Sequence, residues 1–79
     1  MKATWTYYAE GTPPGRWLLW LDGDVIGMAI PMANGMWATY HVSPGGPVGD
    51  RVMQKGARCD DIEAAKLTVE SACASRGVL

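Results

Sequence analysis

The sequence predicts an α+β fold, in which an antiparallel meander of four to five strands precedes one C-terminal α-helix that packs on one face of the sheet. Three observations predict it. Two hairpin signals, Asp22-Gly23 and Asn34-Gly35, separate stretches rich in aromatic and branched residues. A helical pattern occurs in one place, over residues 60–75. The chain of 79 residues has the length of one small domain, so we expect a single domain over residues 1–79.

The stretch 17–30 is expected to form the central hairpin. Asp-Gly suits a type I′ turn, because both central residues of that turn need a positive φ, which glycine adopts freely and aspartate tolerates. The first strand of this hairpin is apolar at every position. Successive side chains of a strand point to opposite faces. One face therefore receives Trp17, Leu19 and Leu21, and the other receives Leu18 and Trp20.

The first strand of the sheet is expected over residues 4–10, which alternate between the two faces and favour β-structure. The loop 11–15 contains two successive prolines, which cannot donate to a ladder, and it returns the chain antiparallel into residues 16–21. The third strand is expected over residues 24–30. Gly27 in its middle indicates a bulge or the close approach of a neighbour.

The fourth strand is expected over residues 36–42, after Pro31 has ended the third and the Asn-Gly turn has reversed the chain. The Gly- and Pro-rich segment 43–50 predicts a surface loop. Residues 51–58 hold at most a short edge strand, and their basic side chains would discourage pairing with another sheet.

The C-terminal helix is predicted over residues 60–75. Asp60 or Asp61 can cap its N-terminus, Glu63 stands at capping-box spacing from Asp60, and Gly77 supplies a stop. An apolar stripe at helical spacing should face the sheet; it consists of Ile62, Ala65, Val69, Ala72 and Cys73.

One helix cannot shield this sheet. Four strands spaced about 4.8 Å apart span roughly 19 Å, whereas a helix with its side chains is about 10–12 Å wide. On the helix itself, Lys66 and Glu70 lie beside the apolar stripe, and we expect them to form an i,i+4 pair.

The second face of the sheet has no helix to cover it. Because monomeric proteins seldom leave a large contiguous apolar patch exposed, we expect another protein surface to cover it.

Aromatic residues dominate the strongest contacts of protein interfaces. We therefore expect the partner or dimer surface to be formed by Trp17 or Trp20 together with Trp37 and Tyr40. Which of the two strand residues faces outward is left open by the alternation.

Seven basic and eight acidic residues give a net charge of -1, which argues against nucleic acid as the main partner. Arg51, Lys55 and Arg58 lie close together in the sequence and could contact phosphates from a sheet edge. They support an alternative function, that of a homodimeric DNA- or RNA-associated regulator with a truncated, antitoxin-type fold similar to double-stranded RNA-binding domains.

The residues that could perform catalysis or hold a metal have structural explanations. His41 lies in the middle of a strand without a nucleophile nearby, and Asp22 and Asp24 are explained by a turn and a strand start. We expect no catalytic residue, no cofactor and no metal.

Cys59 and Cys73 flank the predicted helix, so about 20 Å of helix would separate them, far beyond the reach of a disulfide. We expect two reduced thiols, with Cys73 packed as a small hydrophobic residue and Cys59 near the surface. The alternative for Cys59 is a disulfide between two copies of the chain.

No apolar signal segment begins the chain, and prolines and glycines interrupt the uncharged stretch 25–49. We expect no membrane association and a location in the cytoplasm of a bacterial host cell.

The tryptophan-rich meander followed by a helix resembles small proteins of phages and mobile elements, and is most similar to small anti-CRISPR proteins acting on type I-C systems. The resemblance is carried by WLLWL at 17–21, the Asp22-Gly23 turn, residues 25–30, NGMWA at 34–38 and DDIEAAKLTVE at 60–70. These motifs are shared by many small phage proteins, so no site residue is carried over. The resemblance implies a non-enzymatic inhibitor that binds a subunit of the Cascade surveillance complex and prevents it from binding target DNA.

Overall fold

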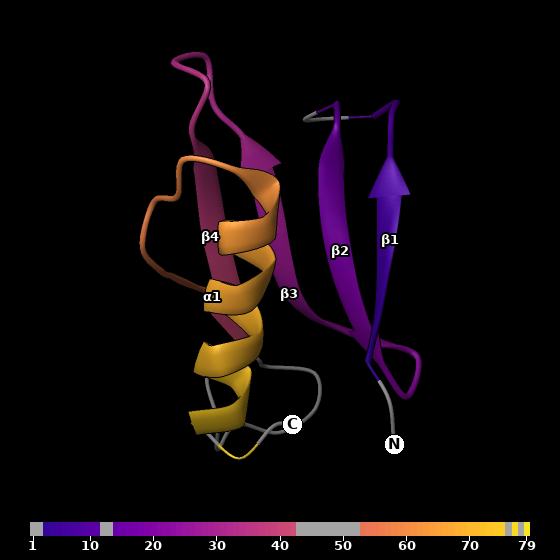
Figure 1. The fold of residues 1–79 in the computed structure, drawn as a ribbon. Helices are drawn as coiled ribbons and strands as arrows, with labels where there is room; N and C mark the ends of the chain where they lie inside the picture. Colours follow the sequence, from indigo (N-terminus) through magenta and orange to yellow (C-terminus); the bar gives the residue numbers. More distant parts are fainter. Residues whose placement is uncertain (1–2, 12–13, 43–52, 76, 78) are drawn as a thin grey trace.

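The computed structural model describes residues 3–11, 14–42, 53–75, 77 and 79. It contains a five-stranded antiparallel sheet in the order β1-β2-β3-β4-β5, and one C-terminal helix lies across one face of the sheet (Figure 1). The elements are β1 (Thr4–Tyr8), β2 (Arg16–Leu21), β3 (Asp24–Pro31), β4 (Trp37–Val42), β5 (Met53–Lys55) and α1 (Ile62–Ser75). The predicted α+β fold with a meander sheet and a C-terminal helix is confirmed.

The ends of several strands differ from the prediction. β1 ends at Tyr8, two residues before the predicted end at Glu10. Pro31 was expected to end the third strand, but it is the last residue of β3 and lies opposite Trp37. Proline is tolerated there because the next N–H, that of Met32, closes the hairpin by donating to the Met36 carbonyl at 2.8 Å.

The two hairpin turns have different geometries. Asp22 and Gly23 have φ angles of 53° and 81°, so both central residues adopt the positive φ that a type I′ turn requires. In the second turn the positive φ is that of Gly35, at 85°, and the Asn34 side-chain oxygen accepts a hydrogen bond from the Met36 N–H at 3.1 Å. The second connection is therefore longer than the two-residue turn that Asp-Gly forms.

The helix begins after Asp61 and not after Asp60. The Asp61 Oδ1 atom accepts a hydrogen bond from the Ala64 N–H at 2.7 Å, which identifies Asp61 as the N-cap. Glu63 therefore precedes the position that would complete a capping box. At the other end Gly77 has a φ of 75° and donates its N–H to the Ala74 carbonyl, so the predicted glycine stop is confirmed.

Gly27 marks the place where the helix comes closest to the sheet. A Cβ atom at this position would overlap with Cγ1 of Val69, which projects from α1. Next to it, Leu19 pairs with Gly27 while Trp20 pairs with Val25, so β3 contains an extra residue at this point. The sequence predicted a close approach or a bulge, and the structure has both.

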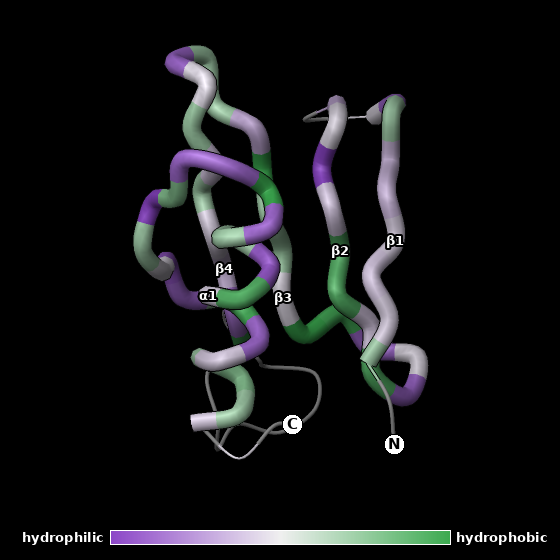
Figure 2. The backbone as a smooth tube through the Cα atoms, in the orientation of Figure 1, coloured by the Kyte–Doolittle hydropathy of each residue, from purple (hydrophilic) through white to green (hydrophobic). Residues whose placement is uncertain are grey.

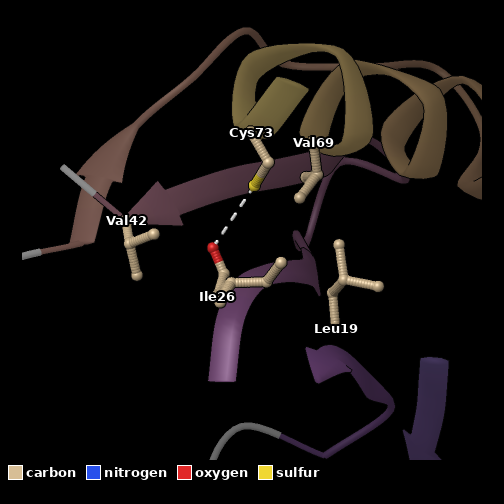
Figure 3. Packing of buried hydrophobic residues seen from close by; sticks show 5 residues of the cluster. All are labelled: Leu19, Ile26, Val42, Val69 and Cys73. Carbon is tan, nitrogen blue, oxygen red and sulfur yellow. Dashed lines mark hydrogen bonds between the residues drawn. The ribbon is translucent and has the colours of Figure 1, made fainter. Parts of the chain in front are cut away.

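Two buried clusters hold the helix on the sheet. Figure 2 shows hydrophilic and hydrophobic residues alternating along α1, as expected for a helix with one buried face. The predicted apolar stripe is confirmed, since Ala65, Val69 and Cys73 are its fully buried members. The first cluster, drawn in Figure 3, consists of Leu19, Ile26, Val42, Val69 and Cys73. The second consists of Ala29, Cys59 and Ala65, with Trp5, Trp17 and Trp37 packed against it.

Cys73 is a buried thiol, as the sequence predicted, and its Sγ atom lies 3.5 Å from the Ile26 carbonyl oxygen that accepts its hydrogen bond (Figure 3). Burial raises the pKa of Cys73 above its ordinary value of 9.0, and the negative charge of Glu70 raises it further. The unfolded thiol therefore loses its proton at a lower pH than the folded one.

This pKa difference predicts how stability depends on pH. Above the unfolded pKa of 9.0 the folded chain keeps a proton that the unfolded chain releases, so the free energy of unfolding should fall as the pH rises from there through the folded pKa. Urea unfolding between about pH 7 and pH 10 measures this fall. In the Cys73→Ala variant the free energy of unfolding should fall less over this pH range. An equal fall in the variant and the wild type would contradict the assignment of the pH dependence to Cys73.

Candidate functional site

The sheet face that points away from α1 carries a continuous set of large apolar side chains. Strand register assigns them to this face, because Thr6, Leu18, Met28 and Tyr40 lie in one row across four strands, and residues that are directly opposite share a face. The helix contacts the sheet at Gly27, where a Cβ atom would meet Val69. Met28 is the next residue, so its side chain points to the opposite face, away from the helix. We call this surface the far face; its apolar residues are Leu18, Trp20, Val25, Met28, Ile30 and Tyr40.

Each of these apolar side chains is partly exposed. None of them belongs to either buried cluster or is among the partly buried residues packed against those clusters in the part of the chain that the structure describes. Ala38, which pairs with Ile30, is almost fully buried. The centre of the far face is thus a broad apolar area without a charged group.

Charged and hydroxylated residues surround this apolar centre. On the β1 side the row continues into Thr6, and on the β5 side Lys55 lies opposite Tyr40. At one end the Arg16 guanidinium stacks over the Tyr8 ring at 4.9 Å from its centroid. An apolar centre with a polar rim is the usual arrangement of a protein interface.

On the helix side, α1 lies over β3 and β4 and leaves β1 and β2 beyond it (Figure 1). Two charged side chains of the helix nevertheless reach tryptophans of β1 and β2. The Lys66 ammonium lies 3.8 Å from the centroid of the Trp17 ring, and Glu70 accepts a hydrogen bond of 3.1 Å from the Trp5 indole N–H. The sequence predicted that Lys66 and Glu70 would pair with each other. In the structure Lys66 contacts Trp17 and Glu70 contacts Trp5 instead. These contacts attach β1 and β2 to the helix.

The four aromatic residues predicted to form a partner surface do not share a face. Trp17 and Trp37 lie on the helix side and pack against the second buried cluster. Trp20 lies opposite Val25 and Tyr40 lies opposite Met28, so both belong to the far face. The expectation that Trp37 and Tyr40 would act on one surface is corrected, because three positions along a strand place two side chains on opposite faces.

The predicted group of basic residues is only partly described. Arg51 lies outside the described residues. Lys55, at the end of β5, and Arg58, in the segment that leads to the helix, are both exposed. They are available to a partner.

Cys59 is buried, contrary to the prediction that it would lie near the surface. Its backbone pairs with Trp37 through hydrogen bonds of 2.8 and 2.9 Å, which hold the segment before the helix on the edge of β4. Its Sγ atom lies 3.3 Å from the Thr68 hydroxyl. A disulfide between two copies would require this contact to open, so the geometry argues against that alternative.

The remaining features of the described residues bear on catalysis, metal binding and membrane insertion. His41 is buried in β4, beneath the segment that contains Gly56. Among the described residues there is no group of three or more His, Cys, Asp or Glu side chains that could hold a metal ion. The described part of the chain also lacks a helix that is both long and apolar enough to cross a membrane.

Four residues of the far face were not among the residues predicted to form the partner surface, namely Leu18, Val25, Met28 and Ile30. A signal for them was present in β3, where Gly27 and Ala29 alternate with Met28 and Ile30. A helix packs closely over small side chains, so the small residues mark its face and the large ones mark the opposite face.

No protein-family model, curated protein or solved structure matches this chain.

Proposed function

We propose that this protein is a non-enzymatic inhibitor that binds another protein through the far face. The observation that carries the proposal is the apolar centre formed by β2, β3 and β4 on the side of the sheet away from α1. Trp20 and Tyr40 would be its anchors, since aromatic residues contribute most of the binding energy in such interfaces. The polar rim would set the orientation of the partner.

The resemblance of the sequence to anti-CRISPR proteins supplies the identity of the partner in this proposal. The protein would bind a subunit of the type I-C Cascade complex and prevent the complex from binding target DNA. An inhibitor of this kind needs a binding surface and no catalytic group, and the apolar centre of the far face is the observation that supports this proposal.

The test uses purified type I-C Cascade and a labelled target duplex. The wild-type protein should bind Cascade and block its binding to the duplex. Met28→Glu places a charge at the centre of the far face and should weaken binding to Cascade at least about tenfold, because a charge buried at an interface without a partner is costly. Leu67→Glu, which adds the same charge at an exposed position on the helix, is the matched control and should bind like the wild type.

Circular dichroism and thermal unfolding would establish that both variants are folded. Absence of Cascade binding by the wild type would reject the anti-CRISPR function. Equal binding by folded Met28→Glu and the wild type would reject the far face as the site.

The second candidate, a nucleic-acid-associated regulator, is favoured by the exposure of Lys55 and Arg58. Its affinity for DNA or RNA should fall steeply between low and moderate salt, because phosphate contacts release counterions. An interface centred on apolar side chains should change little over the same range. Measuring binding to Cascade and to nucleic acid across salt concentrations separates the two functions.

A further inference from the structure

We propose that the outer edge of β1 pairs antiparallel with β1 of a second copy of this chain, joining the two sheets into one continuous sheet. The proposal rests on the backbone and side chains of β1 and does not depend on the function proposed above.

The two edges of the sheet are protected very differently. In the described part of the chain β1 pairs with β2 alone, so one side of its backbone is unpaired. Its sequence, TWTYY, contains no charged residue, no proline and no glycine. The opposite edge, β5, has three residues and ends in Lys55. Natural proteins protect exposed edges with short strands and charged residues, so β5 has the features of an edge that avoids pairing and β1 does not.

The direction of the backbone groups in β1 follows from one hydrogen bond. The Tyr8 carbonyl accepts the Gly15 N–H at 2.9 Å, so it points toward β2. In an antiparallel ladder alternate residues point their N–H and C=O groups to the same side. The backbone groups of Trp5 and Tyr7 therefore point outward, away from β2.

These outward groups match each other when two copies of β1 are related by a two-fold axis at Thr6. Trp5 of one copy then lies opposite Tyr7 of the other, and Tyr7 of the first lies opposite Trp5 of the second. Both are hydrogen-bonded pairs, because the residues in them are the ones with outward groups. The strand is thus complementary to itself over its whole length.

The side chains of β1 are also compatible with this register. Tyr7 is 52% exposed, the highest value among the aromatic residues of the described chain, and its ring already stacks on Trp17 at a centroid distance of 4.9 Å. In the pair, Tyr7 would contact Trp5 of the second copy on the same face, and aromatic cross-strand pairs stabilise sheets. Thr6 would lie opposite Thr6, without any charge repulsion.

No steric obstacle from the helix opposes the pairing. α1 lies over β3 and β4, on the far side of β2 from this edge (Figure 1). The two-fold axis would stand perpendicular to the sheet, so both helices would lie on one side and both far faces on the other. The contact is small, because one five-residue strand from each copy forms it. We therefore expect a weak dimer that forms only at high protein concentration.

Sedimentation equilibrium over a range of protein concentrations tests the pairing. The wild-type protein should form dimers as its concentration approaches about 1 mM. Thr6→Lys and Thr6→Glu place like charges opposite each other at the axis, and each should weaken dimerisation at least about tenfold. An equimolar mixture of the two variants should dimerise again, because the charges are then opposite. Ser71→Lys adds the same charge on an exposed part of the helix and should dimerise like the wild type.

Three results would overturn the proposal: a wild-type protein that stays monomeric at all concentrations, dimerisation of Thr6→Lys equal to that of the wild type, or a mixture of the two charged variants that does not recover. Dimerisation that Met28→Glu abolishes and Thr6→Lys does not would assign the contact to the far face instead. The mixing experiment keeps the test valid if one variant alone is less stable, since recovery requires both to be folded.

Discussion

Replacing Leu19 by alanine should lower the free energy of unfolding by about 3 kcal/mol, the size typical of a leucine that is fully enclosed. Leu19 has no exposed surface and belongs to the cluster that joins β2 to the helix through Val69. The loss combines the apolar area removed and the cavity left behind. Since small domains are stable by only about 5–15 kcal/mol, the variant should unfold at a much lower urea concentration.

Leu18→Ala is the matched control for this prediction. Leu18 is the preceding residue of the same strand, has the same side chain and lies partly exposed on the far face. Its loss should cost about 1 kcal/mol, because little of a cavity forms at a surface that water reaches. Equal losses in the two variants would contradict the assignment of the two faces. In the proposed function Leu18→Ala, but not a folded helix-surface variant, should also weaken binding to the partner.

Gly27→Ala should destabilise the protein by about 2 kcal/mol, the cost of forcing an extra methyl group into a packed core. The new Cβ would overlap with Cγ1 of Val69 and would lie 3.3 Å from the Tyr40 carbonyl oxygen. In most strands alanine is at least as favourable as glycine, since it loses less conformational freedom on folding. A loss of stability therefore reports the contact with the helix.

A double-mutant cycle with Val69→Ala isolates this contact. In the Val69→Ala background the valine methyl groups are absent and the new alanine would occupy part of their space, so Gly27→Ala should cost at least about 1 kcal/mol less than in the wild type. The measurement is urea unfolding of the four proteins. Additive losses would show that Gly27 does not contact Val69 in solution.

Several features of the structure followed from local sequence. The Asp22-Gly23 turn could be predicted because few residue pairs tolerate positive φ at both positions. The helix could be predicted from its apolar period and its stop at Gly77. The sequence left Asp60 and Asp61 open as the N-cap, and the structure identifies Asp61. These features depend on interactions within a few residues, which the sequence displays directly.

Other features depended on contacts between distant segments. Cys59 was expected near the surface, but its pairing with Trp37 places it beneath the helix, and nothing in the residues around Cys59 indicates that pairing. Lys66 and Glu70 were expected to pair with each other because they are neighbours on the helix. Tryptophans from β1 and β2 contact them instead, since these two strands extend beyond the helix.

The order of the elements, the first turn and the apolar stripe of the helix followed from the residues alone, whereas the alternation in β3 is shifted by its extra residue, which leaves Val25 on the far face and Ile26 in the buried cluster. Which sheet face the helix covers, and therefore which aromatic residues are available to a partner, depends on contacts between distant segments. Because residues 17–21 of β2 are apolar on both faces, the sequence pattern of that strand favours neither face for the helix. The choice was made across the sheet, at Gly27, where the absence of a side chain lets Val69 reach the backbone. Trp20 and Tyr40 were left on the opposite face.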